Sequence, residues 1–524
     1  MAIEGTLGLS LPEFRNEPYT DFTAPENRAR MEAAQQKVRA LLGREYDLLL
    51  CGERVRADEK LTSVNPARPD EVVGVLQKAT VEQAARAIDL AWSNFPRWSK
   101  TPAEARIGMA LRLAAIIRER KLEFDAWLVF EAGKTWPEAE AEVAEAVDFC
   151  EYYAREMARL AGPQTVVQLP GERDEMRYLP LGVGVVIPPW NFALAILCGM
   201  TVAALVAGNT VVIKPSSETP TIAAVFAEAL LEAGFPPESF CFLTGSGGKI
   251  GDALVAHPKT RFTSFTGSRD VGLHINELAA KAQPGQIWIK RVVAEMGGKD
   301  AILVDSDCDL EAAVEGVAVS AFGYQGQKCS ACSRAIVHAD VYDAFVEKLK
   351  ARTEKIRVGA PDDPAHYMGP VISAGARRTI LSYIEIGRGE GRLLTGGEES
   401  SELGYYVPPT VFVDVDSRSR LFQEEIFGPV LAVAKARDFD ELMTMANDSV
   451  YGLTGAIYSN NPEHVQRARE EFFVGNMYIN RKCTGAMVGA HPFGGFNMSG
   501  TDSKAGGPDY LLLFLQAKSI AEKV

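Results

Sequence analysis

Residues 183–215 have the sequence VGVVIPPWNFALAILCGMTVAALVAGNTVVIKP. Two apolar, β-branched runs, at 183–189 and 210–215, enclose an apolar stretch at 192–208 that is rich in small residues and short for a membrane span. We expect a strand, a helix buried against a sheet and a second strand. Unbroken apolar strands that alternate with helices are typical of a parallel, doubly wound sheet.

The same alternation continues toward the C-terminus. We expect a helix near 220–233, strands at 239–245 and 262–267, and a helix from about Ser268. A second alternating region runs from about 294 to 490, with strands expected at 301–305, 333–339, 429–436 and 476–480. The chain therefore has the pattern of two α/β domains.

Three further segments complete the predicted organisation. Residues 26–46 have helical periodicity and many charges, which indicates an exposed helix, and 80–161 predicts helices that cover a sheet. Residues 162–181 suggest a two-stranded excursion, and the tail at 509–524 suggests an apolar strand. We expect the excursion and the tail to pair across a subunit boundary, because an uncovered strand edge invites association.

Composition narrows the class of protein. The formal net charge of -14 argues against a nucleic-acid surface. The eight cysteines have no repeating spacing, which favours free thiols and a reducing compartment. The six histidines show no metal-ligand spacing, so we expect no metal. The N-terminal residues lack a basic stretch followed by an apolar one, so we expect a cytoplasmic protein without a membrane segment.

Polar and glycine residues gather where the expected strands end. Lys214, Gly267 and Ser268 all follow strands, and ligands of doubly wound sheets bind beyond the carboxyl ends of the strands. Gly267, Ser268 and Gly272 open a helix, where a phosphate can approach backbone N–H groups. Tight strand–helix packing would explain the same glycines. Lys214 is either a ligand of ribose hydroxyls or a solvated strand-end lysine.

Cys329 and Glu295 are the strongest chemical candidates. Gly326 and Lys328 precede Cys329, and nearby positive charge lowers a thiol pKa, which makes a nucleophile. Taken alone, the residue is better explained as an inert structural cysteine, and Cys332 completes a single C-x-x-C. Glu295 ends an apolar run, where burial raises a carboxyl pKa and suits a general base. A salt-bridged structural glutamate remains the alternative.

The combination of motifs is more specific than its parts. FTGS, EMGGKD, GQKCS, EEIFGP, PPWNF and NRKCTGAMVGAHPFGGFNMSGT together resemble the aldehyde dehydrogenase superfamily from about residue 50 to the C-terminus. FRNEP, GQKCSACSR and TGAMVGAHPFGG followed by SGT most resemble the members that act on L-glutamate γ-semialdehyde. The resemblance implies oxidation of this aldehyde to L-glutamate through a cysteine thioester, the second step of proline catabolism. Another semialdehyde, such as succinate semialdehyde, and a non-catalytic protein on the same fold are the alternatives.

The resemblance also implies an aldehyde dehydrogenase-like α/β architecture. A Rossmann-type dinucleotide-binding domain would comprise 1–161 and 182–293, and a catalytic domain 294–499. A β oligomerisation flap would comprise 162–181 and 500–524. The cofactor would be NAD, with NADP as an alternative. We expect a homo-oligomer built from dimers, and a proline dehydrogenase is a further candidate partner.

Site residues follow position by position from the resemblance. Cys329 would be the nucleophile, Glu295 the general base and Asn191 the oxyanion donor. Cofactor contacts would come from Ile187, Pro188, Pro189, Trp190, Lys214, Ser217, Gly247, Gly251, Gly267, Ser268, Glu425 and Phe427. Substrate contacts would come from Ser330, Gly485, Ala486 and Phe493.

Two positions carry open questions. Glu145 is our candidate for the substrate ammonium, with a surface helix glutamate as the alternative reading. The family often has an acidic residue three positions after the ribose lysine, where this chain has Ser217, with Glu218 one place later. We therefore expect NADP to be accepted better than an acidic residue at 217 would permit, because a carboxylate repels the 2′-phosphate.

Overall fold

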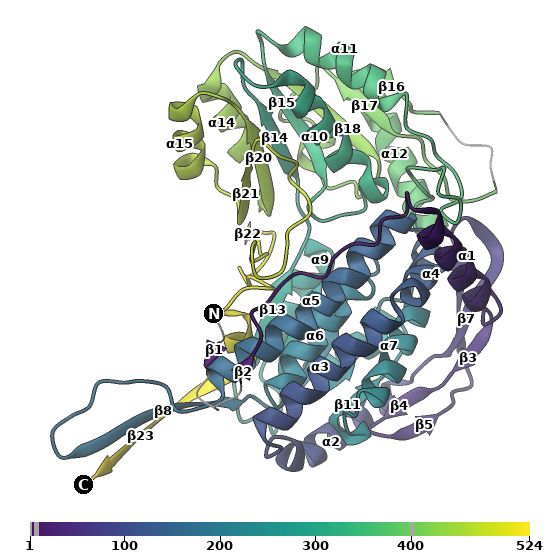
Figure 1. Cartoon of the computed structure of the whole chain (residues 1–524). Coiled ribbons are helices and arrows are strands. Elements are labelled where there is room, and N and C mark those ends of the chain that lie inside the picture. The colour runs from purple at the N-terminus through teal and green to yellow at the C-terminus, as the bar shows by residue number, and fades with distance from the viewer. Residues whose placement is uncertain (1–2, 5–9, 399–402) are drawn as a thin grey trace.

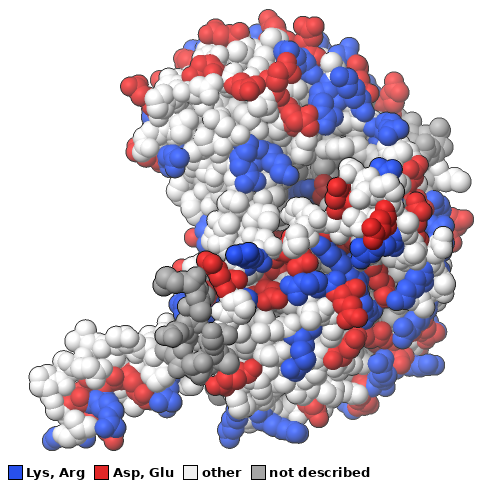
Figure 2. Space-filling view, viewed as in Figure 1, with Lys and Arg blue, Asp and Glu red and all other residues white. Residues whose placement is uncertain are grey.

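The computed structural model describes residues 3–4, 10–398 and 403–524. Figure 1 shows two α/β bodies, one above the other, and a long two-stranded arm that projects from the lower body. Figure 2 shows acidic and basic side chains interspersed over the visible face. Within the described residues, no helix is both long and apolar enough to span a membrane.

The lower body contains a seven-stranded sheet in the order β13-β12-β9-β10-β11-β4-β5. Its first five strands are parallel, and β4 and β5 continue it antiparallel. The strands are β4 (Leu48–Leu50), β5 (Glu53–Val55), β9 (Val183–Ile187), β10 (Thr210–Ile213), β11 (Phe240–Phe242), β12 (Thr260–Thr266) and β13 (Arg291–Glu295).

The predicted strand–helix–strand unit at 183–215 is confirmed. β9 and β10 pair in parallel, with Val186 opposite Ile213, and α6 (Ala195–Val206) connects them. Nearly all of α6 is buried, which explains its unbroken apolar sequence without a membrane. The other helices of this body are α2 (Val81–Trp98), α3 (Ala103–Glu119), α4 (Lys121–Ala132), α5 (Trp136–Leu160), α7 (Pro220–Glu232), α8 (Asp252–Ala256) and α9 (Arg269–Ala280).

The upper body contains a second seven-stranded sheet in the order β16-β17-β18-β15-β14-β20-β21, parallel except for β16. Its strands are β14 (Asp300–Val304), β15 (Cys332–His338), β16 (Arg392–Thr395), β17 (Thr410–Val413), β18 (Val430–Ala436), β20 (Thr454–Tyr458) and β21 (Asn476–Ile479). Its helices are α10 (Leu310–Phe322), α11 (Tyr342–Thr353), α12 (Ala374–Glu390), α13 (Arg420–Gln423), α14 (Phe439–Asn447) and α15 (Pro462–Glu471).

Smaller elements surround these bodies. A three-stranded sheet has the order β3-β7-β6, and two short pairs, β1-β2 and β19-β22, lie elsewhere. The strands are β1 (Ile3–Glu4), β2 (Ser10–Leu11), β3 (Arg44–Tyr46), β6 (Lys60–Asn65), β7 (Arg68–Gln77), β19 (Tyr451–Gly452) and β22 (Phe496–Asn497). The short helical turns are η1 (Pro237–Ser239), η2 (Gly247–Gly251), η3 (Gly323–Gly326) and η4 (Tyr510–Phe514).

The helix predicted at 26–46 was too long and too exposed. α1 covers Pro25–Arg39, and the chain then enters β3. Gly43 has φ +77°, a conformation that ends helical geometry, and β3 pairs with β7. Met31 and Val38 of α1 are fully buried. The many charged residues on the other faces of the helix had led us to expect that the whole helix is exposed.

The arm corrects two further predictions. Residues 162–181 contain one long strand, β8 (Glu172–Pro180), whose partner is β23 (Leu515–Lys523) of the same chain rather than a strand of another subunit. The apolar residues 510–514 are not part of that strand. They form the short helix η4, whose Leu511 and Phe514 are buried in the core of the lower body.

Candidate active site

A large cavity lies where strands of the lower sheet end, and it has a volume of about 1300 Å³. We call it the strand-end cavity. Eleven of the twelve predicted cofactor residues line it: Ile187, Pro188, Pro189, Trp190, Lys214, Ser217, Gly247, Gly267, Ser268, Glu425 and Phe427. Gly251 does not. It lies behind Lys214, where an added Cβ would come within 3.9 Å of the lysine side chain.

Two charged side chains occupy one part of the strand-end cavity. Lys214 is buried at the end of β10, which lowers its pKa to about 8, and its Nζ donates to the Pro215 carbonyl at 3.0 Å. Glu218 also lines the cavity, and burial raises the pKa of its carboxyl. Glu218 therefore lines this cavity although it lies one residue after position 217, where the family often has its acidic residue.

The glycine turn at Gly267 and Ser268 combines both functions that the sequence suggested. α9 begins directly after Ser268, and the first N–H groups of a helix have no partners within the helix, which makes them anion donors. An added Cβ at Gly267 would come within 2.5 Å of the Phe265 ring, and one at Gly272 within 2.4 Å of Met296 Sδ. Close packing and an open helix terminus thus coexist at this turn.

Glu425 is fixed at the inner end of the strand-end cavity. Its carboxylate accepts a hydrogen bond from the Gly298 N–H at 3.0 Å, and an added Cβ at Gly297 would overlap the carboxylate. Burial raises the pKa of Glu425 to about 7. Phe427 stands edge-on to Trp190 with ring centroids 5.3 Å apart. The residues at this end suit a planar ring with an attached sugar.

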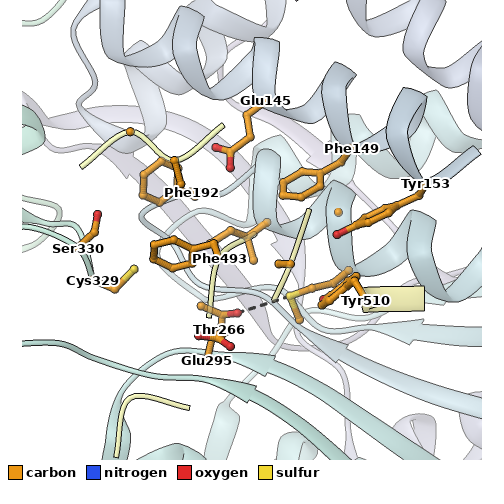
Figure 3. Close-up of a pocket in the computed structure, with 16 residues that line it drawn as sticks. Glu145, Phe149, Tyr153, Phe192, Thr266, Glu295, Cys329, Ser330, Phe493 and Tyr510 are labelled. Carbon is orange, nitrogen blue, oxygen red and sulfur yellow. Dashed lines mark hydrogen bonds between the residues drawn. The ribbon is translucent and has the colours of Figure 1, made fainter. Parts of the chain in front are cut away.

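A second cavity of about 810 Å³ also reaches Cys329, and we call it the inner cavity (Figure 3). Cys329 lines both cavities. Glu295 and all five predicted substrate residues line the inner cavity as well: Glu145, Ser330, Gly485, Ala486 and Phe493. Residues from α5, from the end of β13 and from loops of both bodies therefore meet around one sulfur atom.

The loop that carries Asn191 is held from two sides. Glu142 on α5 accepts hydrogen bonds from the Leu194 and Ala195 N–H groups at 2.6 and 3.2 Å, and its carboxylate pairs with buried Lys134. The Asn191 amide donates one hydrogen to the Gln327 carbonyl at 3.0 Å. Its second amide hydrogen has no acceptor within the described part of the chain, so it can donate to a reacting oxygen.

Glu295 ends β13 in a cluster of hydrogen-bond donors. Its Oε1 accepts from Ser503 Oγ at 2.5 Å and from the Ser503 N–H at 3.3 Å, and its Oε2 accepts from the Gly495 N–H at 3.2 Å. Burial outweighs these bonds and raises its pKa to about 7. Each carboxylate oxygen offers about two lone pairs, so Oε2 keeps one for a water molecule.

The loop at 485–486 presents backbone donors. Gly485 has φ +78°, and Arg481 donates to the carbonyls of Thr484 and Gly485 at 3.0 and 3.1 Å. Among the described residues, nothing accepts from the N–H groups of Gly485 and Ala486. The Ser330 hydroxyl likewise makes no hydrogen bond there. These three donors and the inner cavity together form a site for an anion.

Glu145 is an acidic group without a partner. It makes no hydrogen bond or ion pair with the described residues, and Figure 3 shows it on α5 above the rings of the inner cavity. Burial, with a smaller effect of nearby Glu142, raises its pKa to about 8. A cation bound beside it would favour the ionised form, so the position suits an ammonium group.

Comparison with known proteins places this arrangement in a family. The model of the aldehyde dehydrogenase family matches residues 54–520. The chain belongs to the aldehyde dehydrogenase family. The predicted family and its α/β fold are confirmed.

Close relatives cover nearly the whole chain. The 1-pyrroline-5-carboxylate dehydrogenase of Geobacillus thermodenitrificans is 58% identical over 509 residues, which are 97% of this chain and 99% of that protein. The crystal structure of 1-pyrroline-5-carboxylate dehydrogenase from Thermus with bound NAD is 49% identical, with a TM-score of 0.97, and the match covers 98% of this chain and 100% of that one. Proline utilization A from Bdellovibrio bacteriovorus is 42% identical, with a TM-score of 0.96, over 99% of this chain and 55% of that chain.

One prediction about Cys329 was wrong. The sequence suggested that Lys328 lowers the Cys329 pKa, but Lys328 pairs with Glu138 at 2.8 Å. Burial, followed by the nearby carboxylates of Asp300 and Glu295, raises the pKa of the Cys329 thiol well above its usual range. The resting group is therefore a thiol, and a base must take its proton.

Cys332 lies apart from this chemistry. It begins β15, is almost fully buried, and its Sγ donates to the Arg334 carbonyl at 3.4 Å. All eight cysteines are free. The two cysteines of the C-x-x-C therefore lie in different surroundings: Cys329 lines both cavities, and Cys332 is buried in the core.

Several lining residues were missed from sequence. Phe149 and Tyr153 lie on α5 at four-residue steps from Glu145, so helical spacing would have identified them. Phe192 directly follows Asn191. The others come from distant segments with no shared pattern. They are Ile196, Gly199, Met200, Thr266, Ala505 and Tyr510 in the inner cavity, and Ser216, Glu218, Phe265, Thr266, Val271, Met296 and Gly297 in the strand-end cavity.

Proposed function

We propose that this aldehyde dehydrogenase oxidises L-glutamate γ-semialdehyde, which forms from 1-pyrroline-5-carboxylate, to L-glutamate with NAD. The observation that carries the proposal is that Cys329 lines both cavities. An aldehyde in the inner cavity and a dinucleotide in the strand-end cavity would meet at its sulfur. The names of the closely similar relatives support the same substrate and cofactor.

The first step is addition of the Cys329 thiolate to the aldehyde carbon. Glu295 lines the same cavity and, with its pKa near 7, is the group best suited to accept the thiol proton. The new oxyanion would accept hydrogen bonds from the free Asn191 amide hydrogen and the Cys329 N–H, which has no acceptor among the described residues. Fixed donors of this kind stabilise the tetrahedral state.

Bound NAD supplies the hydride acceptor. We propose that the α9 N-terminus at Ser268 holds its pyrophosphate, Lys214 its adenosine ribose and Glu425 its nicotinamide ribose, with Phe427 beside the nicotinamide. Loss of hydride from the carbon leaves a thioester on Cys329. Glu295 must first release the thiol proton to solvent; it then takes a proton from a water molecule at its free Oε2 lone pair, and hydrolysis releases the carboxylate and regenerates the Cys329 thiol.

The far end of the substrate would occupy the remaining polar groups of the inner cavity. The α-carboxylate would accept hydrogen bonds from Gly485, Ala486 and Ser330, and the α-ammonium would face Glu145. Phe493 and the ring of Phe192 would contain the short aliphatic chain (Figure 3). Recognition of opposite charges at one end separates this substrate from succinate semialdehyde, which carries only a carboxylate.

We also propose the organisation that the sequence suggested. The lower body would bind the dinucleotide, the upper body would carry Cys329, and the arm would join subunits into a homo-oligomer of a cytoplasmic enzyme. Val167, Leu169 and Leu179 near or on the arm are exposed by 84%, 55% and 39%, which suits an interface. Removal of residues 515–524 should lower the molar mass in sedimentation. An unchanged mass would exclude this interface. A proline dehydrogenase would be the supplier of substrate, and co-purification of the two enzymes tests direct contact.

The decisive experiment is a comparison of aldehydes with NAD. NADH formation should give the highest kcat/KM for glutamate semialdehyde, above succinate semialdehyde and propanal. Glu145→Gln should lower kcat/KM for glutamate semialdehyde by about tenfold, the scale of a lost hydrogen bond to a charged group, and spare propanal. Glu119→Gln, at the exposed C-terminal end of the neighbouring helix α3, is the control. A wild-type preference for propanal or succinate semialdehyde would contradict the proposal.

A further inference from the structure

The segment at 11–22, LPEFRNEPYTDF, takes no part in the chemistry described above, although its FRNEP motif is one of the sequence's distinguishing features. We call it the N-terminal strap. In Figure 1 it is the dark purple segment that runs along α5 between β2 and α1. It therefore crosses the helix that carries Glu145.

The strap is bonded to α5 on both sides of Glu145. Asp148 accepts hydrogen bonds from Asn16 Nδ2 and from the Glu17 N–H, each at 2.7 Å. Glu140 accepts from the Thr20 N–H at 2.6 Å. These carboxylates lie within about one and a half turns of Glu145 along the helix. Three hydrogen bonds thus join the strap to the part of α5 that carries Glu145.

Basic side chains hold the strap backbone in the same place. Arg155 Nε donates to the Pro12 carbonyl at 2.9 Å, and Lys121 Nζ donates to the Pro18 carbonyl at 2.7 Å. Lys121 also pairs with Glu140 at 2.5 Å. Asn16 lies between these two attachments, so its position is fixed independently of its own side chain.

The strap also contacts the loop at 485–491. Asn16 Nδ2 donates its second hydrogen to the Val488 carbonyl at 3.0 Å. The Tyr19 hydroxyl lies 3.6 Å from Met487 Sδ. The Phe14 ring packs so close to Gly489 that a Cβ added there would lie 3.0 Å from it. One amide group therefore connects α5 to the loop that presents the Gly485 and Ala486 N–H groups.

We propose that Asn16 is a positioning residue that sets the spacing between the Gly485–Ala486 donors and Glu145. Arg481 fixes the loop before Ala486, and the Asn16 bond to Val488 fixes it two residues after. The spacing matters because an α-amino acid carries its carboxylate and its ammonium on one carbon atom, at a fixed separation. This inference rests on the proposed function: the strap is a specificity device for a substrate that carries both charges.

The first test is Asn16→Ala with two aldehydes. KM for glutamate semialdehyde should rise about tenfold, the scale of losing well-placed hydrogen bonds to a charged group, with kcat within about twofold. Both constants for propanal should stay within about twofold. Arg15→Ala, which changes the neighbouring exposed strap residue, should match the wild type. An equal KM change for both aldehydes, or a loss confined to kcat, would overturn the proposal.

A second pair of variants separates the loop contact from docking of the strap. Asn16→Asp removes both donated bonds and places a carboxylate beside Asp148. In the double variant with Asp148→Asn, the new amide on α5 can donate to the new carboxylate at position 16, so the strap is again hydrogen-bonded to α5. Position 16 still has no N–H group to donate to the Val488 carbonyl. The double variant should keep the raised KM of Asn16→Ala. Recovery of the wild-type KM would show that docking alone matters and would overturn the proposal.

Hydrogen exchange provides a readout that does not depend on the substrate. Amides in 484–491 should exchange faster in Asn16→Ala than in Arg15→Ala, while amides of α5 remain protected. Unchanged exchange in this loop would overturn the positioning role. A wild-type preference for propanal combined with faster loop exchange would contradict the proposed function alone, so the two failures are distinguishable.

Discussion

The strand-end cavity and the inner cavity meet at Cys329 but are built by different means. The strand-end cavity is formed by strand ends, glycine turns and a helix terminus, and its charged side chains Lys214 and Glu425 are held by bonds to the backbone. The inner cavity is formed largely by aromatic rings, and Glu145, which lines it too, pairs with no residue in the described part of the chain. The strand-end cavity suits a ligand that makes many polar contacts with the backbone. The inner cavity selects its ligand through a few separate polar groups among apolar rings.

The two cavities also place similar carboxylates in different roles. Glu295 and Glu425 both have pKa values near 7 because both are buried. Glu295 accepts three hydrogen bonds within the inner cavity, whereas Glu425 accepts one from Gly298. We infer that position relative to Cys329, rather than acidity, separates a base from a cofactor ligand.

Replacing Cys329 should have the largest effect. Cys329→Ala should reduce dehydrogenase activity by more than about a thousandfold, because no thioester can form. NAD binding, measured by calorimetry, should stay within about twofold because the strand-end cavity is otherwise intact. Cys308→Ala, a partly buried cysteine that lines neither cavity, is the control. Substantial activity in Cys329→Ala would remove the sulfur from the mechanism.

Asn191→Ala should have the next largest effect. Loss of an oxyanion donor lowers kcat by roughly a hundredfold to a thousandfold. KM for the aldehyde and the Kd of NAD should change little, because the donor acts on charge that develops during reaction. Steady-state kinetics and NAD titration measure both. A defect confined to KM would make Asn191 a ground-state contact instead.

The pH dependence of kcat distinguishes the two carboxylates. Glu295 with a pKa near 7 acts as a base only when ionised, so kcat should fall by about tenfold per pH unit below about pH 7 and level off above it. Glu295→Gln should be slow and lack this limb. Glu425→Gln, which removes a carboxylate of similar pKa, should retain it. If the limb disappears instead in Glu425→Gln, the assignment of the base is wrong.

The smallest predicted effect concerns cofactor choice. Glu218 lines the strand-end cavity, and its carboxylate would repel a 2′-phosphate by about 1 kcal/mol at this solvated position. Glu218→Gln should therefore raise kcat/KM for NADP about fivefold and leave NAD nearly unchanged. Glu277→Gln, which removes an exposed carboxylate that lines neither cavity, is the control. An equal change with both cofactors would show that Glu218 does not face the ribose.

The sequence predicted the core of the fold because its signal was local. The run at 183–215 alternates apolar strands with an apolar helix, and the structure has β9, α6 and β10 there. The prediction failed where the same sequence pattern is compatible with two different structures. The apolar residues 510–514 resemble a strand but form a buried helical turn, and the partner of β8 lies more than three hundred residues away in the same chain.

The candidate site also has one part that the sequence predicts and one part that it does not. The strand-end residues could be predicted because parallel strands bring their ends together, whatever the loops do. The inner cavity depends on the positions of α5, the loop at 485–486 and η4, which no periodicity encodes. The pKa of Cys329 was predicted in the wrong direction because sequence adjacency to Lys328 does not show that Glu138 already pairs with that lysine.

Trapping the covalent intermediate tests the central claim most directly. Glu295→Gln, in which solvent must take the thiol proton slowly, would be incubated with NAD and one equivalent of glutamate semialdehyde for many wild-type turnover times, quenched in acid and digested for mass spectrometry. We predict one equivalent of NADH and a glutamyl group, localised by fragmentation to Cys329, in a peptide that also contains Cys332. Stoichiometric NADH with no adduct on Cys329, or an adduct on Cys332, would contradict the account.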